Sequence, residues 1–174
     1  MKKTGMIIMI IVAVIMLCAG CGDKYDDYYR FSEDEIYIEN HEVKSGPEFT
    51  NKYYIIENDN DLTLARNDYL HFDELPGIGR ILEEYPLDKN TYFIEMMCMG
   101  NDEVALKAIL IDKETNRIYT DSDYKRGDKK YSTNVARFWV SYAVIEKDKL
   151  QGFDFSEQKE EIYGSVSQSP DEDR

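Results

Sequence analysis

One uninterrupted apolar run near the start of the chain, from Met6 to Ala19, is the feature that most constrains how these 174 residues can fold. Lys2 and Lys3 precede the run, and no acidic residue occurs before Asp23. A transmembrane helix needs roughly 20 apolar residues, whereas the apolar region of a secretory signal peptide has roughly 7 to 15. The run therefore predicts a signal peptide over residues 1–20, and the other residues must fold without it.

The residues that end the run indicate a particular kind of signal peptide. Leu17-Cys18-Ala19-Gly20-Cys21 resembles the lipobox of bacterial lipoproteins, in which small residues precede a required cysteine. Leu17 lies one position earlier than the aliphatic residue usual in that family, because Cys18 stands there. The resemblance implies that Cys21 carries a diacylglycerol and that cleavage falls between Gly20 and Cys21. It also implies a protein held at the extracytoplasmic face of the cell membrane by a covalent lipid.

Two other fates of the leader stay open. The run can remain as an uncleaved N-terminal helix, or the chain can be secreted after ordinary cleavage behind Ala19 or Gly20. Lipidation differs from both in its physical result, because a second acyl chain converts reversible membrane binding into stable anchoring. We expect a mature protein that is anchored to the membrane and does not span it.

The charge of the mature chain restricts its partners. Loss of residues 1–20 removes two lysines and no acid, which leaves 19 basic and 35 acidic side chains and a formal charge of −16. Nucleic-acid affinity depends on lysine and arginine side chains that displace counterions, so nucleic acid is excluded as a partner. The same charge is repelled by anionic headgroups. We therefore expect the domain to stand off the membrane, tethered only by its lipid.

Cysteine usage points to a domain that is stabilised by its hydrophobic core. Cys18 leaves with the signal peptide and Cys21 is consumed by lipid, so Cys98 alone remains and no intramolecular disulfide can form. Cys98 lies in an apolar stretch, which predicts a buried and inert thiol.

Composition divides the mature chain into three parts. Residues 21–35 are acidic, with interspersed aromatic residues, and are interpreted as a lipidated tether whose aromatic side chains can dock on the domain. Residues 36–163 are interpreted as one α+β domain. Residues 164–174 are small, polar and acidic, which predicts a disordered tail.

Short runs of β-branched and aromatic residues predict strands within this domain. Turns are expected at 58–61, 100–102 and 113–116, where Asn, Asp or Gly residues cluster between apolar runs. The strands are expected at Ile36 to Ile38, Tyr53 to Glu57, Leu62 to Ala65, Tyr92 to Met99, Val104 to Asp112 and Arg117 to Thr120.

The clearest predicted helix begins at Pro76 and ends before Pro86, with Ile78, Ile81, Leu82 and Tyr85 on one face. Residues 134–146 fit either a strand or a helix, and their β-branched and aromatic content favours the strand. Together these elements predict an antiparallel β-sheet packed on one short helix.

No residue pattern identifies a catalytic, cofactor-binding or metal-binding site. His41 begins a partial HExxH motif without the second histidine, and His71 has no partner at ligand spacing. A cysteine nucleophile would need one of these histidines beside Cys98, which the sequence leaves open. The remaining candidates are interpreted as solvated turns, exposed faces or chance triplets: Asn58 to Asp61, Asp121 to Asp123, Gly77 with Gly79, Glu83 with Glu84, and the basic cluster Lys125 to Lys130.

The sequence leaves three candidate functions open. The retained anchor favours a non-catalytic binding or accessory module whose partner is a protein, basic in charge, or an envelope polymer. A hydrolase that attacks glycan or peptide with paired carboxylates is the second candidate. The third is an inhibitor or immunity-type protein, since a strongly acidic surface is suited to capture a basic protein.

Overall fold

The structure is a computed structural model, and it describes residues 25–43, 51–99, 102–125 and 137–164. The predicted signal peptide, the lipid site Cys21, the cleavage site Gly20–Cys21 and residues 165–174 of the predicted tail lie outside these residues. So do Gly100 and Asn101 of one predicted turn, and all of the basic cluster except Lys125.

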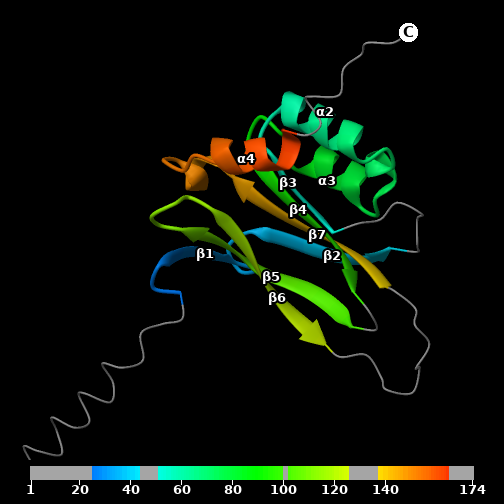
Figure 1. Cartoon of the computed structure of the whole chain (residues 1–174), viewed down its shortest axis with the longest axis horizontal. Coiled ribbons are helices and arrows are strands. Elements are labelled where there is room, and N and C mark those ends of the chain that lie inside the picture. Colours follow the sequence, from blue (N-terminus) through cyan, green and yellow to red (C-terminus); the bar gives the residue numbers. More distant parts are fainter. Residues whose placement is uncertain (1–24, 44–50, 100–101, 126–136, 165–174) are drawn as a thin grey trace, which may run out of the picture.

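Seven strands form two antiparallel sheets (Figure 1). The three-stranded sheet has the order β1-β5-β6, and the four-stranded sheet has the order β2-β7-β4-β3. The strands are β1 (Tyr28–Ser32), β2 (Tyr37–Val43), β3 (Lys52–Ile56), β4 (Asn90–Met99), β5 (Glu103–Asp112), β6 (Ile118–Lys125) and β7 (Arg137–Glu146).

Three layers result, with the four-stranded sheet in the middle. Figure 1 shows the helices above this sheet and the three-stranded sheet below it. The helices are α2 (Asp59–Asp68), α3 (Ile78–Glu84) and α4 (Ser156–Tyr163), with 3-10 turns η1 (Phe72–Glu74) and η2 (Lys147–Leu150). The predicted α+β class is confirmed, but the described chain has two sheets and three α-helices where one of each was expected.

Strand alternation explains how one sheet can serve two cores. In β7, Val140, Tyr142 and Val144 belong to the hydrophobic cluster beneath the helices, whereas Ala143 and Ile145 belong to the cluster between the sheets. Successive side chains of a strand point to opposite faces, so β7 is apolar in both directions. Residues 137–146 are thus a strand, as the composition favoured, and the helical alternative is excluded.

The turn predicted at residues 58–61 and the strand predicted at Leu62 to Ala65 are wrong. These residues form the N-cap and the first part of helix α2, and not a hairpin. The side chain of Asn58 accepts a hydrogen bond from the backbone N–H of Asp61 at 3.0 Å, which is the geometry of an N-cap. Leu62 and Ala65 are buried on the same side of this helix. Clustered Asn and Asp residues are typical of both turns and helix N-caps, so the residue pattern alone does not distinguish the two.

The predicted helix after Pro76 is confirmed as α3. Ile78 and Ile81 are fully buried against the four-stranded sheet, and Leu82 and Tyr85 pack at the margin of the same core. Gly77 precedes the helix with φ +82°, a left-handed conformation that glycine adopts without strain.

The hairpin predicted at residues 113–116 is confirmed and joins β5 to β6. Asn116 has φ +56°, and Asp112 accepts backbone hydrogen bonds from Glu114 and Thr115 at 2.9 and 2.8 Å. By contrast, β4 and β5 flank residues 100–102, where a turn was predicted, but these two strands lie in different sheets. The described strands therefore form two sheets and not the single sheet that was expected.

The segment interpreted as a tether contributes a strand. Tyr28 to Ser32 form β1, and each of these residues pairs with a residue of β5. The interpretation of residues 21–35 as a tether is therefore wrong for this part, and the folded domain begins before residue 36. Only docking of the aromatic side chains was expected, whereas the backbone itself joins the sheet.

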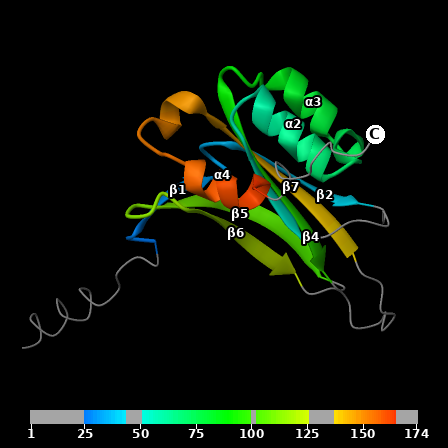
Figure 2. The ribbon, with the colours of Figure 1, turned by 45° about the horizontal axis from the view of Figure 1, so that its top comes forward.

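Helix α4 covers the side of the molecule where β3 and β6 are edge strands (Figure 2). The Gln158 side chain accepts a hydrogen bond from the backbone N–H of Ile118 in β6 and donates one to its carbonyl, at 2.9 and 3.2 Å. The Tyr163 hydroxyl donates to the carbonyl of Ile55 in β3 at 2.9 Å. The helix thus occupies backbone groups of both edge strands, which blocks pairing with another chain at those positions.

Candidate functional site

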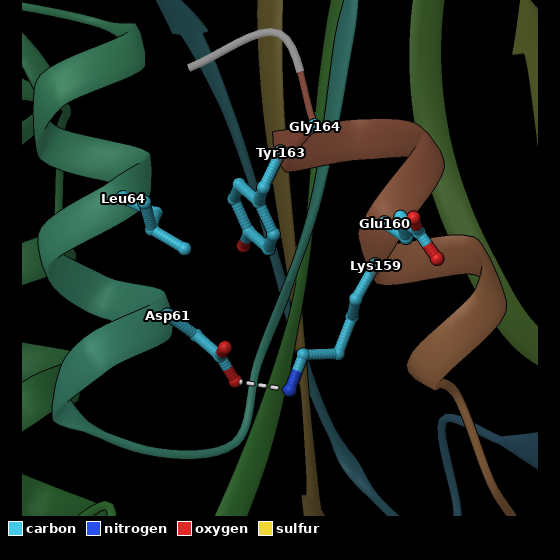
Figure 3. Close-up of a pocket in the computed structure, with 6 residues that line it drawn as sticks. All are labelled: Asp61, Leu64, Lys159, Glu160, Tyr163 and Gly164. Atoms are coloured by element: carbon cyan, nitrogen blue, oxygen red, sulfur yellow. Dashed lines mark ion pairs between the residues drawn. The ribbon is translucent and has the colours of Figure 1, made fainter. Parts of the chain in front are cut away.

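The candidate pocket lies between α2 and α4 and has a volume of about 220 Å³ (Figure 3). Leu64 of α2 and the ring of Tyr163 form its apolar walls. The charged groups on its lining are Asp61 on α2 and Lys159 and Glu160 on α4, and Gly164 completes it. It is an open recess, large enough for a small apolar group beside a charged pair.

Lys159 is the centre of charge in this pocket. Its Nζ lies 2.6 Å from Oδ2 of Asp61 and 3.0 Å from Oε2 of Glu57. Burial alone would lower the pKa of Lys159, but the hydrogen bonds with Asp61 and Glu57 outweigh burial and raise it. The ammonium group is therefore kept protonated and is unsuited to act as a base or a nucleophile.

Asp61 is almost inaccessible, with 3% of its surface exposed. Besides Lys159, its Oδ2 accepts hydrogen bonds from the backbone N–H of Glu57 and the side-chain amide of Asn58, both at 3.0 Å. A buried carboxylate needs this degree of compensation. Asp61 thus fixes the start of α2 and docks α4 onto it.

A second polar cluster lies where β2 meets α3. The Glu39 carboxylate contacts Arg80, Tyr37 and His41, and Arg80 also bonds Glu84 at 2.8 Å. Burial would raise the pKa of Glu39, but the hydrogen bonds from Tyr37 and Arg80 bring it below its usual value. Glu39 is thereby held as a carboxylate and is unsuited to act as a general acid.

The two histidines are not brought together. His41 on β2 has Nε2 2.8 Å from Glu39 Oε1 and packs edge-on against Tyr142, whereas His71 lies 3.2 Å from Glu74 and against Tyr69. Their partners have no residue in common. Because His41 lies on a strand, the partial HExxH motif is not on a helix.

Cys98 corrects a further prediction, because its side chain is exposed. It lies near the end of β4, on the same face as Met96 but beyond the helices that cover that face. The apolar stretch around Cys98 predicted burial, but the position where the covering layer ends could not be inferred from the sequence.

A third polar group lies between the sheets. Glu95 on β4 accepts a hydrogen bond from the Thr120 hydroxyl of β6 at 2.9 Å through Oε1. Three polar atoms here are buried and have no hydrogen-bond partner among the described residues. They are Oε2 of Glu95, the hydroxyl of Tyr53 beside it on β3, and the hydroxyl of Ser122 on β6. Burial raises the pKa of Glu95, and the hydrogen bond from Thr120 partly opposes this.

The other sequence candidates are placed without a common site. Glu83 and Glu84 lie on α3, Asp121 bonds Tyr25 at 2.8 Å, and Gly77 and Gly79 start α3. Within residues 25–43, 51–99, 102–125 and 137–164, no group of three His, Cys, Asp or Glu residues could hold a metal ion. In the same part of the chain, no helix is long and apolar enough to cross a bilayer.

Comparison of the chain with protein-family profiles, with curated proteins and with solved structures finds no match.

Proposed function

We propose that this chain is a lipid-anchored bacterial lipoprotein, held at the extracytoplasmic face of the cell membrane, whose α+β domain is a non-catalytic binding or accessory module. The observation that carries the proposal is the sequence Leu17 to Cys21, which resembles a lipobox and follows an apolar run with a basic start.

The chemistry of the two carboxylate clusters supports binding over catalysis. Lys159 is paired with both Asp61 and Glu57, and Arg80 is paired with Glu39. A glycosidase needs one carboxyl group that retains a proton and a second carboxylate at a set separation. Carboxylates paired with cations favour the ionised state, which suits a structural or recognition role.

The acidic charge supports an inhibitor of a basic protein as the second candidate. A formal charge of −16 on the mature chain would attract a basic partner and increase its association rate. This candidate shares the anchor with the first and differs only in the kind of partner.

The anchor is tested by the mass of the purified protein and of its N-terminal peptide. The expected result is loss of residues 1–20 and a diacylglycerol on Cys21. Cys21→Ser should instead accumulate as the full-length precursor, whereas the control Cys98→Ser should be processed and lipidated normally. A wild-type protein with an unmodified Cys21 would overturn the proposal.

The partner is tested with the lipidated protein as bait in an envelope extract, at low and at high ionic strength. Electrostatic capture between exposed charges weakens as salt shortens the Debye length. One basic protein that is lost at high salt would support the inhibitor, and a retained partner or polymer would support the binding module. Turnover of an envelope polymer by the purified protein would contradict both.

A further inference from the structure

The distance between the anchor and the folded domain is short. The structure describes the chain from Tyr25, which is only four residues after Cys21. An extended chain spans at most about 3.6 Å per residue, so Tyr25 lies within about 14 Å of the Cys21 backbone. If Cys21 carries the lipid, as proposed above, the domain cannot move far from the bilayer.

The chain after Tyr25 is fixed to the domain and cannot extend this reach. The Tyr25 hydroxyl donates to Asp121 at 2.8 Å, and the backbone N–H of Lys113 donates to the carbonyl of Asp27 at 3.0 Å. The guanidinium of Arg30 lies 5.4 Å from the ring centre of Tyr25. From Tyr28 onward the backbone is part of the three-stranded sheet.

The surface around this point has the composition of a membrane-interface region. We define the anchor pole as residues 25–29, the hairpin 113–116 and Phe153. Tyr29 is 49% exposed and packs edge-on against Phe153, with 5.1 Å between the two ring centres. The Lys113 ammonium lies 5.4 Å from the ring centre of Tyr29. An exposed tyrosine ring beside a lysine is favoured at the boundary between headgroups and acyl chains.

The charges of the anchor pole indicate the kind of lipid. Asp26, Asp27 and Glu114 are exposed here beside Lys113. Because acids outnumber the lysine, an anionic headgroup would be repelled, whereas a zwitterionic headgroup offers a partner to both signs.

The opposite end of the molecule follows from the strand directions. Strands β4, β5 and β7 extend between the anchor pole and a distal end, where the last residue of β4 (Met99) and the first residues of β5 and β7 (Glu103 and Arg137) lie. Ten residues of extended strand, as in β5, cover about 33 Å. Figure 1 shows the start of β1 and the ends of β4 and β6 at opposite sides of the molecule.

We propose that the lipidated protein rests its anchor pole on zwitterionic headgroups, so that the strands point away from the membrane and the distal end faces the surrounding space. This orientation rests on the proposed lipid anchor. It departs from the expectation that the acidic domain stands off the membrane, because four residues are too few to allow that.

Two labelling sites separate the pole from the distal end. Cys98 is exposed near the distal end, and Glu114 is exposed in the hairpin, where its side chain forms no hydrogen bond or ion pair with the described residues. The full-length chain is expressed in a host that lipidates it, with Cys21 blocked by lipid. The fluorophore is attached to Cys98 or, in a Cys98→Ser background, to Glu114→Cys. Both proteins are reconstituted in phosphatidylcholine vesicles that contain a shallow spin-labelled lipid quencher.

Quenching several-fold stronger at residue 114 than at residue 98 is the expected result. Equal quenching at both sites, or stronger quenching at Cys98, in a protein that floats with the vesicles would overturn the orientation alone. A protein that fails to float would overturn the lipid anchor, and the orientation with it.

A lengthened tether tests the physical cause. Insertion of about twenty Gly and Ser residues after Gly22 adds a flexible reach of about 25 Å. Quenching at residue 114 should then decrease toward the value at Cys98. Unchanged quenching would show that the surface binds the bilayer without help from the short tether, and would overturn the role that we give to it.

Discussion

The two faces of the four-stranded sheet are built from the same strands but differ in chemistry. The face beneath the helices buries three tyrosines, Tyr54, Tyr92 and Tyr142, with aliphatic residues around them. The face toward the three-stranded sheet is apolar around Phe93 and polar farther along β4, at Glu95. The helix face is thus apolar at its centre and polar at its edge strand β2, where Glu39 and His41 lie, whereas the inter-sheet face is divided along its length.

The division has a physical consequence for the two sheets. The Asn40 side chain accepts hydrogen bonds from the Leu106 backbone N–H at 2.9 Å and from the Ser141 hydroxyl at 2.7 Å. Burial of apolar area is not directional, whereas these bonds fix one register of β5 against β2 and β7. Apolar packing therefore supplies the cohesion of the sandwich, and the polar half supplies its alignment.

The largest effect is expected from the apolar half. Phe93→Ala should lower the free energy of unfolding by about 4 kcal/mol, because it removes a fully buried ring that contacts Phe155 and leaves a cavity. The neighbouring change on the helix face, Ile94→Ala, should cost about 3 kcal/mol. Urea unfolding of both variants measures this. If the three layers form one cooperative unit, both variants show a single transition, and a separate transition for either face would contradict that.

Removal of Asn40 tests the polar half. Asn40→Ala should cost about 2 kcal/mol, because the Leu106 backbone N–H is left without its hydrogen bond in a buried position. Asn40→Asp keeps an accepting oxygen, and below about pH 4, where its carboxyl is protonated and adds no buried charge, it should lose less. Thermal melts of both variants measure the effect. Equal losses would mean that the accepting oxygen is not what Asn40 contributes.

The docking of α4 is expected to depend on Lys159. Lys159→Met should cost about 2 kcal/mol, because Asp61 would be left as a buried charge without its cation. Lys149→Met is the control, since Lys149 is exposed and its ammonium bonds, among the residues that the structure describes, only the carbonyl of Glu35. Adding Asp61→Asn to Lys159→Met should restore part of the loss. A double variant less stable than Lys159→Met would show that the two residues act independently.

Local patterns predicted the β5–β6 hairpin from its turn residues and helix α3 from its helical spacing. The strand at residues 137–146 fitted two periods, and its β-branched and aromatic content favoured the strand. The pattern was ambiguous at Asn58 to Asp61, because the same residues serve a turn and an N-cap.

Features that depend on distant contacts could not be predicted. The residues of β1 have the composition of an acidic tether, and only their pairing with β5 shows that they form a strand. Helix α4 has few apolar residues from which a helical period could be recognised. The pocket was missed for the same reason, because its lining residues come from α2 and from α4, which are far apart in the sequence. The only available signal for α4 was Asp154, whose side chain accepts the Ser156 backbone N–H at 2.9 Å.

The smallest effect is expected at Glu95, and it has the opposite sign. Burial raises the pKa of Glu95 in the folded state, so folding favours the protonated carboxyl. The stability contributed by this proton is fully present below the unfolded pKa and is lost as pH rises through the folded pKa. Near neutral pH a buried carboxylate with an unpaired Oε2 therefore opposes folding.

Glu95→Gln should accordingly raise the free energy of unfolding by about 1 kcal/mol near neutral pH. The gain should disappear below about pH 4, where the carboxyl is protonated in both states and resembles the amide. Thermal melts of wild type and variant at the two pH values measure the difference, with Glu114→Gln as an exposed control. A gain of equal size at both pH values would mean that Glu95 is not the charge that opposes folding in the polar half. A loss at neutral pH would mean that its carboxylate, like the side chain of Asn40, helps to align the sheets.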